Sequence, residues 1–369
     1  MRVVPALLLG ALLCASCTPA GQANDPQLIA HALQLDAPAL ASSGAHTAFA
    51  WAGFDEADVH QSARLLAAGG LQNPVILPLP PTHPFDQQLI AGADGALHLL
   101  WLDKAADGHG NRLYSALLGP DLSVQRGPVE VSSDATYRYA ALTDGQGGVW
   151  AAWSSGNPAE PVLTLGRIDV LGRPLPPASL QRRGEFPALA ANRGGAQSLF
   201  WRSEGQLWRL SLADGLPLGT AVLSAAVGLW PGDQLDGLWA APCGSRMCVG
   251  WNLTRADGLA ESWLSSGGAD ADQWAPPQRL AGLSWLTPNR ETQASDAALT
   301  GVAQSQHGLA LVTLAGGAVD HVELAAPDVD VMGAPALARA GDAWLLAWAQ
   351  PGPDSARLVF VHHALNPAR

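Results

Sequence analysis

Lysine is almost absent from this 369-residue sequence: Lys104 is the one lysine, and charged residues make up 14% of the chain. Lysine and arginine together number 20 against 32 acidic residues, so the formal charge is 20 − 32 = −12. A nucleic-acid-binding protein needs a basic patch that neutralises phosphates. The composition therefore excludes that class, and it disfavours electrostatic attraction to anionic lipid headgroups.

Catalytic signatures are also missing. The sequence contains no Gly-x-Ser-x-Gly elbow, no His-Glu-x-x-His pair, no phosphate loop and no dinucleotide fingerprint. His362 and His363 are adjacent on an expected strand, so they point to opposite faces and cannot share one metal ion. The acidic loop 103–111 does not match the spacing of a calcium loop. We therefore expect neither a metal ion nor a cofactor.

One short apolar run, Val3–Leu13, lies near the start of the chain and is too short to cross a bilayer. It follows the charged Arg2 and leads through small residues to Cys17, a pattern that resembles a bacterial lipoprotein signal. The resemblance implies that Cys17 is lipidated and, because Thr18 rather than Asp follows it, that the protein is sorted to the outer membrane. The alternative is an ordinary secretory signal cut near Ala20.

This interpretation divides the chain into three parts. Residues 1–17 form the signal peptide ending at the lipidated cysteine, residues 18–26 form a flexible polar tether, and residues 27–369 form one folded domain. An exported protein meets an oxidising compartment, where cysteines pair. Cys243 and Cys248 flank four residues of an expected hairpin, so we predict that they form a disulfide.

Tryptophans recur at a nearly fixed interval. Neighbouring copies are 50, 52, 48 and 50 residues apart, and a later copy falls 297 residues after the first, which is six steps of 49.5; the six are Trp51, Trp101, Trp153, Trp201, Trp251 and Trp348. The expected seventh copy is the run Gly308–Thr313, in which Thr313 replaces tryptophan. A period of this length indicates a repeat architecture.

Each repeat holds four short strand-like segments separated by turns. Tyr139–Leu142 shows the small-residue first strand, Asp144–Gly147 the turn that follows it, Asn111–Leu117 the third strand and Pro128–Val131 the fourth. Four antiparallel strands per repeat predict an all-β fold, a β-propeller with seven four-stranded blades. Six and eight blades remain alternatives, because the sixth unit is irregular.

The two chain ends predict how the ring closes. The last unit stops after three strands, and an extra strand, Gln27–Leu33, precedes the first unit. We expect this strand to complete the last blade and so leave no open edge. The tryptophans, at the ends of second strands, are predicted to pack between blades rather than to bind a ligand.

The stretch Ser266–Trp274 resembles a decayed Asp-box, the Ser-x-Asp-x-Gly-x-Thr-Trp turn of sialidase-like propellers. The resemblance implies that Asp270 or Asp272 is the turn carboxylate and that Trp274 is the packing residue. Sialidases also need an arginine triad, an Arg-Ile-Pro segment and a tyrosine nucleophile paired with glutamate. This chain has no Arg-Ile-Pro, and Tyr137 is its one tyrosine placed to face a channel. The resemblance therefore implies the fold and not the activity.

Propeller ligands usually bind near the channel mouth, on the face that carries the loops from each fourth strand to the next first strand. Those loops mix carboxylates, arginines and aromatic residues, a composition able to hold a sugar or a peptide. The candidate ligand-binding residues are Asp86, Tyr137, Arg138, Arg183, Glu185, Trp230, Asp236, Trp285 and Arg290. The alternative is an ordinary solvated rim.

Three functions follow as hypotheses. The first is an exported, membrane-anchored propeller of the bacterial cell envelope that binds or scaffolds without catalysis, with a glycan or an envelope protein as partner. The second is a sialidase-like glycoside hydrolase that uses residues of the channel face. The third is a structural envelope component that acts through protein contacts.

Overall fold

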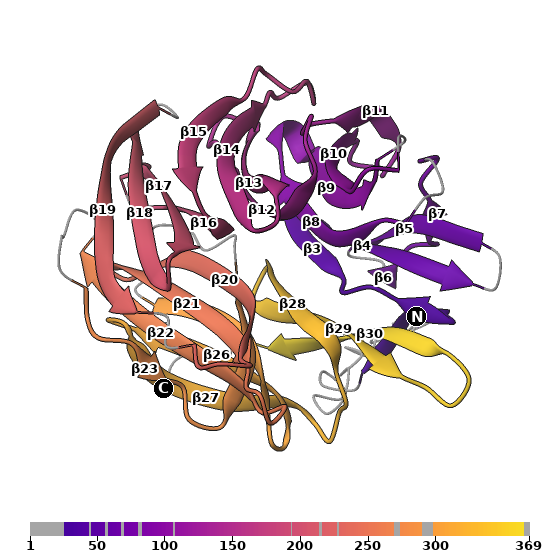
Figure 1. The fold of residues 1–369 in the computed structure, drawn as a ribbon. Coiled ribbons are helices and arrows are strands. Elements are labelled where there is room, and N and C mark those ends of the chain that lie inside the picture. The colour runs from indigo at the N-terminus through magenta and orange to yellow at the C-terminus, as the bar shows by residue number, and fades with distance from the viewer. Residues whose placement is uncertain are drawn as a thin grey trace, which may run out of the picture.

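The computed structural model describes residues 26–364 apart from residues 44–45, 56–57, 68–69, 80–82, 106–107, 193, 214–215, 227–228, 269–273 and 290–297. Its strands form seven antiparallel sheets set around a central axis, so the predicted all-β seven-bladed propeller is confirmed (Figure 1). The predicted signal and the residues up to 25 lie outside the described part. Within the described part there is no helix whose length and apolar character would let it span a bilayer.

The blades are numbered along the chain, and each is given from its innermost strand outward. Blade 1 holds β3 (Ala39–Ser43), β4 (His46–Asp55), β5 (Asp58–Ala67), β6 (Gly70–Leu71) and β7 (Val75–Ile76), with β2 (Gln34–Leu35) also paired to β4. Blade 2 holds β8 (Phe85–Ala91), β9 (Leu97–Lys104), β10 (Asn111–Leu118) and β11 (Val124–Glu130), with the 3-10 turn η1 (Ala93–Gly95) between its first two strands.

The middle blades follow the same plan. Blade 3 holds β12 (Thr136–Thr143), β13 (Val149–Asn157), β14 (Glu160–Ile168) and β15 (Ala178–Arg183). Blade 4 holds β16 (Glu185–Ala191), β17 (Gln197–Ser203), β18 (Gln206–Ala213) and β19 (Leu216–Ala226). Blade 5 holds β20 (Gln234–Cys243), β21 (Arg246–Thr254), β22 (Ala260–Gly268) and β23 (Gln278–Arg279).

The last two blades differ in how they are completed. Blade 6 holds β24 (Leu283–Pro288), β25 (Ala298–Ser305), β26 (Gly308–Ala315) and β27 (Ala318–Pro327). Blade 7 holds β28 (Met332–Ala340), β29 (Ala343–Pro351), β30 (Ala356–Ala364) and, as its outermost strand, β1 (Gln27–Ala32) from the start of the chain.

The predicted closure by the N-terminal strand is confirmed. Strand β1 pairs antiparallel with β30, from Gln27 opposite Phe360 to Ala32 opposite Ala356, and the two lie side by side in Figure 1. Ile29 of β1 is 3% exposed and packs between blades 7 and 1, whereas the neighbouring Leu28 is 49% exposed. The strand therefore both hides the edge of blade 7 and adds to its core.

The hydrophobic core is divided into seven clusters, one at each interface between neighbouring blades. All six periodic tryptophans are buried, with exposures of 0–3%, which confirms their predicted packing role. Three of them stack on an aromatic residue of the third strand; the pairs are Trp101–Tyr114, Trp201–Trp208 and Trp251–Trp263. The third-strand partners Tyr114, Trp208 and Trp263 are partly buried and pack against the core clusters.

The prediction for the sixth unit is wrong in register. The run Gly308–Thr313 belongs to β26, the third strand of its blade, and not to a second strand. The second strand is β25, in which Ala303 occupies the position that tryptophan holds elsewhere. Trp239, from the innermost strand of blade 5, lies in the same core cluster as Ala303 and fills that interface. Because no tryptophan marks the second strand of this blade, the sequence pattern assigned the run to the wrong strand, one too early in the blade.

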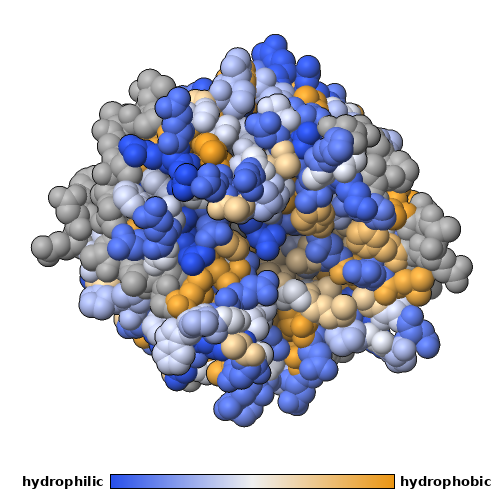
Figure 2. Space-filling view, in the orientation of Figure 1, coloured by the Kyte–Doolittle hydropathy of each residue, from blue (hydrophilic) through white to orange (hydrophobic). Residues whose placement is uncertain are grey.

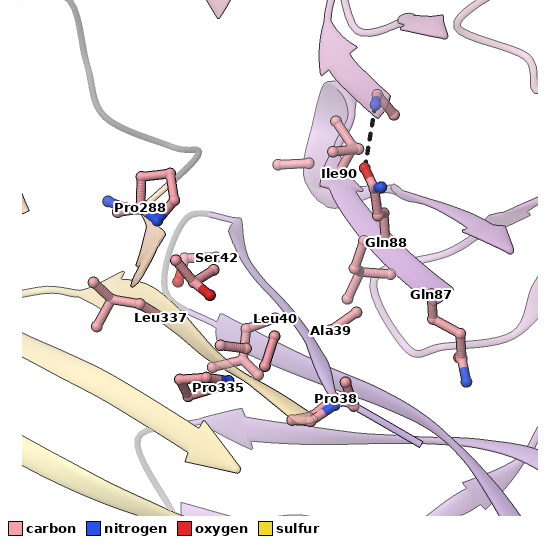
Figure 3. A pocket seen from close by; sticks show the side chains of 18 of the residues that line it. Pro38, Ala39, Leu40, Ser42, Gln87, Gln88, Ile90, Pro288, Pro335 and Leu337 are labelled. Carbon is pink, nitrogen blue, oxygen red and sulfur yellow. Dashed lines mark hydrogen bonds between the residues drawn. The ribbon is translucent and has the colours of Figure 1, made fainter. Parts of the chain in front are cut away.

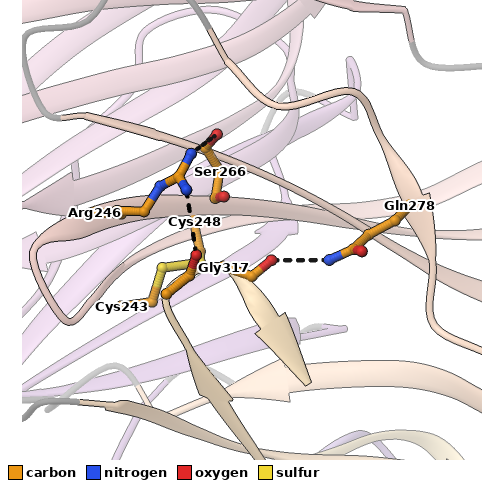
Figure 4. Close-up of a disulfide and its surroundings, with 7 residues drawn as sticks. Cys243, Arg246, Cys248, Ser266, Gln278 and Gly317 are labelled. Carbon is orange, nitrogen blue, oxygen red and sulfur yellow. Dashed lines mark hydrogen bonds between the residues drawn. A yellow bond between two sulfur atoms is a disulfide. The ribbon is translucent and has the colours of Figure 1, made fainter. Parts of the chain in front are cut away.

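The disulfide between Cys243 and Cys248 is present, with Cα atoms 5.8 Å apart (Figure 4). It ties β20 to β21 at their connecting turn, and both cysteines are fully buried. Arg246 in that turn donates hydrogen bonds to the carbonyl oxygens of Gly316 and Ser266, at 3.4 and 3.1 Å. The bridged turn is thereby fastened to blade 6 as well as to its own blade.

Candidate binding site at the mouth of the axial cavity

The propeller has two different faces because its strands alternate in direction. In a four-stranded antiparallel blade, the chain enters the innermost strand on the same face at which the fourth strand ended. We call this the entry face, and it also carries the turns between second and third strands. The opposite face, which we call the exit face, carries the turn that holds the disulfide.

A β-bulge interrupts the pairing of the innermost strand near the entry face of blades 2 to 7, and in blade 1 the break between β2 and β3 stands at the equivalent place. In blade 2, for example, Asp86 and Gln87 stand opposite the single residue Trp101, and in blade 5 Asp236 is the extra residue. We call the seven positions the bulge ring: Asp36, Asp86, Tyr137, Phe186, Asp236, Trp285 and Gly333. Bulges re-aim side chains and occur beside functional sites.

Three non-glycine members of the bulge ring have a left-handed backbone. The φ angles are 52° at Asp86, 52° at Phe186 and 54° at Trp285. Such residues cost about 1–3 kcal/mol each and persist where the surrounding structure enforces them. The recurrence of this costly conformation at one level of three blades identifies the entry end of the innermost strands as a candidate functional site.

Backbone groups connect the acidic members of blades 1 and 2. An oxygen of the Asp36 carboxylate accepts a hydrogen bond from the backbone N–H of Asp86 at 2.8 Å. The carbonyl oxygen of Asp86 in turn accepts one from the hydroxyl of Tyr139 in blade 3, at 2.5 Å. Because each bond crosses from one blade to the next, the two bonds join blades 1, 2 and 3 at the entry end.

A second set of contacts joins blades 3, 4 and 5. The guanidinium carbon of Arg138 lies 5.5 Å from the centre of the Phe186 ring, a cation–π contact. The hydroxyl of Thr254 donates a hydrogen bond of 2.8 Å to the Asp236 carboxylate, which also feels the positive charge of Arg138. Of the candidate residues, the structure therefore brings together Arg138 of blade 3 and Asp236 of blade 5. Phe186, which contacts Arg138, belongs to blade 4, the blade between them.

Burial raises the pKa of two carboxyl groups of the bulge ring. For Asp36, the loss of water outweighs the hydrogen bonds from the backbone of Ala37 and Asp86, which lower its pKa. For Asp236, burial likewise outweighs the Thr254 hydrogen bond and the charge of Arg138. Both groups hold a proton more readily than an exposed aspartate does.

An axial cavity of about 860 Å³ lies along the innermost strands of blades 1, 2, 3, 6 and 7. Its volume is in the range of small-molecule sites. Asp86 and Gln87 line it near the entry face. Leu40, Ile90, Leu337 and Pro288 form an apolar wall (Figure 3). The space-filling view shows the surface hollowed near the centre of the molecule (Figure 2). Within the described residues, both polar atoms of the buried Gln87 amide lack a hydrogen-bond partner.

Several predicted residues lie away from the cavity or are already engaged. The Tyr137 hydroxyl donates a hydrogen bond to the carbonyl oxygen of Gly156, and Glu185 forms an ion pair with Arg202. Arg183 lies on β15, the outermost strand of its blade, where it forms an exposed 3.0 Å ion pair with Glu160. The prediction that Arg183 faces the channel is therefore wrong.

The remaining candidates divide further. Trp230 is in the loop before β20 and is 73% exposed, and Arg290 lies outside the described residues. Trp285 belongs to β24 itself and not to a connecting loop, because the six residues of Leu283–Pro288 are the innermost strand of blade 6. A tryptophan and a proline within so short a segment made it look like a loop.

Sequence reasoning missed Asp36, Phe186 and Gln87. No local motif marks them, because a bulge is a difference in residue number between two paired strands and becomes visible only when both partners are aligned. The spacing from each buried tryptophan back to its innermost strand was the signal that could have revealed them.

The predicted packing role of Trp274 is confirmed. Trp274 is 5% exposed, forms a bridge with Gly267 and meets Phe200 of blade 4 edge-on at 5.6 Å. Asp270 and Asp272 lie outside the described residues. Within the described part, no group of three or more His, Cys, Asp or Glu side chains is placed to hold a metal ion.

No protein-family model matches the chain, and no curated protein sequence matches it. The structure is similar to that of the polysaccharide lyase Uly1, with a TM-score of 0.54 and 7% identity over 92% of this chain and 91% of the lyase. A puromycin-hydrolyzing peptidase from Mycobacterium tuberculosis gives a TM-score of 0.53 and 16% identity over 91% of this chain and 52% of the peptidase.

The NanB sialidase from Streptococcus pneumoniae is also similar, with a TM-score of 0.49 and 10% identity over 92% of this chain and 70% of the sialidase. At such low identities, structural similarity shows the fold alone, and propellers host many unrelated activities. The similarities to the lyase and the peptidase therefore show the fold and leave the activity to the residues of this chain.

Proposed function

We propose that this chain is an exported β-propeller of the bacterial cell envelope that binds a glycan at the mouth of its axial cavity without cleaving it. The observation that carries the proposal is the bulge ring, which places three aspartates and three aromatic residues at the entry ends of the innermost strands, with Asp86 lining the cavity. Aromatic faces pack on the C–H face of a sugar ring, and carboxylates accept hydrogen bonds from its hydroxyl groups.

The charge of the ring narrows the ligand class. Three aspartates, Asp36, Asp86 and Asp236, belong to the ring, Arg138 lies near Asp236, and the whole chain carries a formal charge of −12. A sialic or uronic acid would meet a repulsive field at such a mouth. The proposal is therefore a neutral or amino-sugar glycan.

The engaged tyrosines support a role in binding rather than in sialidase-like chemistry. The hydroxyl of Tyr137 donates to the Gly156 carbonyl, and that of Tyr139 donates to the carbonyl oxygens of Asp86 and Leu100. A tyrosine nucleophile needs a carboxylate base within hydrogen-bond reach, whereas both of these hydroxyls donate to backbone oxygens. Tyr137→Phe should accordingly leave binding within about twofold of the unchanged protein.

A titration of the purified mature protein tests the proposal. Chito-oligosaccharides and cello-oligosaccharides serve as amino and neutral probes, with sialyllactose as the acidic probe. We expect one of the first two to bind and sialyllactose not to bind. Asp236→Ala should weaken binding about tenfold, whereas Asp342→Ala, which removes an exposed carboxylate on the exit face, should have no effect. Equal loss in both variants, or binding of sialyllactose alone, would overturn the proposal.

A second candidate function is glycoside cleavage by carboxyl groups at the same mouth. It is favoured by the raised pKa of Asp36, next to Asp86 at the cavity, since glycosidases use one protonated and one ionised carboxyl group. The same titration decides, because reducing-end products would form with time. Products that disappear in Asp36→Asn would replace the binding function with the catalytic one.

A further inference from the structure

The exposed tryptophan of blade 5 is the outer layer of a continuous stack. Trp251 is buried in the core, and Trp263 stacks on it with ring centres 6.4 Å apart and planes 6° apart. The guanidinium carbon of Arg255 lies 5.7 Å from the centre of the Trp263 ring and 5.8 Å from that of Trp230. Trp230 itself is 73% exposed, so the stack runs from the core to open solvent.

Ion pairs and a tight turn fix the position of Trp230. The backbone N–H of Trp230 donates to the Asp233 carboxylate at 2.9 Å, and the N–H of Asp233 donates back to the Trp230 carbonyl at 3.0 Å. Arg255 bonds to Asp233 at 2.5 Å and to Glu261 at 2.8 Å. Because Asp233 binds both the Trp230 backbone and Arg255, and Glu261 also holds Arg255, the indole is held in place before any ligand binds.

The indole also lies close to the mouth. Asp236 of the bulge ring is the sixth residue after Trp230, so their Cα atoms are at most about 22 Å apart. Both positions belong to the entry face, since the loop of Trp230 leads directly into β20. One oligosaccharide of a few units can therefore span the distance between them.

We propose that the exposed face of Trp230 is a second subsite, which stacks on a distal sugar ring of the glycan held at the mouth. This inference rests on the proposed function and names where the rest of the ligand lies. A sugar ring has an apolar C–H face and a rim of hydroxyl groups, which matches one indole face bordered by charged groups. A protein partner needs a wider apolar core, whereas the indole of Trp230 lies against the charged Arg255 and its backbone N–H is bonded to the Asp233 carboxylate.

Removal of the indole provides the test. Trp230→Ala is compared with the unchanged protein in titrations with chito- or cello-oligosaccharides of one to six units, whichever series binds. We expect an unchanged dissociation constant for one or two units and a loss of about tenfold for four or more, equivalent to about 1.4 kcal/mol.

Trp150→Ala is the matched control. Trp150 also lies under an arginine, with the Arg167 guanidinium carbon 5.6 Å from the ring centre, but it stands at the exit end of β13. Binding of all lengths should be unaffected. An equal loss in both variants, or no dependence on length for Trp230→Ala, would refute the second subsite and leave binding at the mouth intact. Failure of every oligosaccharide to bind the unchanged protein would reject the proposed function itself.

Discussion

The carboxyl group of Asp36 links folding stability to pH. Its pKa is raised in the folded protein by burial, so the ionised form is less favourable there than in the unfolded chain. The folded state then binds more protons in the interval above the unfolded value of 3.8. Stability from this group is therefore greatest at low pH and declines as the pH rises through the folded pKa.

The substitution Asp36→Asn should remove the decline in folding stability that Asp36 causes as the pH rises. An amide oxygen still accepts the hydrogen bond from Asp86 N–H and carries no charge to desolvate. We expect a higher melting temperature than that of the unchanged protein at pH 7, with the difference shrinking towards pH 3. Calorimetry across this range measures it.

Asp121→Asn is a control of opposite sign. The pKa of Asp121 is lowered by hydrogen bonds from the side chain and backbone of Ser123, so its contribution is present at neutral pH and is lost on acidification. This variant should melt lower than the unchanged protein at pH 7 and approach it at low pH. If both variants changed in the same direction, the stated causes would be wrong.

Single residues were predicted well where burial alone decided their role. The periodic tryptophans and the cysteine pair follow from hydrophobic spacing and from compartment chemistry, and both predictions hold. Arg183 and Trp285 were misplaced because a short segment does not distinguish a rim loop from a strand: Arg183 ends the outermost strand of blade 3, and Trp285 lies in the innermost strand of blade 6.

Strand β1 contributes to the fold through one of its two faces. Ile29 is buried between blades 7 and 1, whereas Leu28 is 49% exposed on the same strand. Ile29→Ala should lower the free energy of unfolding by about 2–4 kcal/mol, because it leaves a cavity in a closed interface. Urea denaturation measures the loss.

Leu28→Ala is the control for that variant. It removes an equally large aliphatic side chain from the same strand, and we expect less than about 0.5 kcal/mol of change. Equal effects of the two substitutions would mean that β1 does not occupy the edge of blade 7.

The disulfide holds the turn between β20 and β21 together. Replacing Cys243 and Cys248 together with alanine should cost about 2 kcal/mol, at the low end for disulfides because the closed loop is short. Glycan binding should persist, since the turn lies on the exit face. A variant that kept full stability in chemical denaturation would show that Arg246 and its contacts in blade 6 alone hold the turn.

Elements were predictable where a marker residue repeats. Six of seven blades carry tryptophan on the second strand, and their order and closure were correctly expected. Blade 6 was misread because Ala303 stands at the marker position and Trp239 of the preceding blade fills the space. The core needs volume at that interface but does not dictate which strand supplies it.

At the scale of the whole molecule, the proposed membrane anchor makes a separate prediction. If Cys17 is lipidated, the protein should fractionate with outer membranes, and Cys17→Ser should release it into the soluble envelope fraction. Cell fractionation followed by immunoblotting measures the change. Unchanged membrane association would reject lipidation at this residue, and it would leave the propeller and its binding site untouched.

The overall architecture was the most predictable property, because the same pattern of strands and turns recurs about every 50 residues and each copy supports the others. The site was the least predictable, because it is assembled from one residue of each repeat, at positions where the repeats agree in geometry and differ in side chain.

The bulge positions share a backbone geometry but carry different side chains, and this has a consequence for evolution and engineering. Each bulge residue stands outside the regular pairing of its strand, so exchanging it need not disturb the ladder that carries the blade. The side chains at the seven ring positions can therefore vary while the paired strands around the opening stay the same. A set of variants randomised at Tyr137, Phe186 and Asp236 should therefore yield folded proteins with new sugar preferences at a far higher rate than one randomised at Trp153, Trp201 and Trp251.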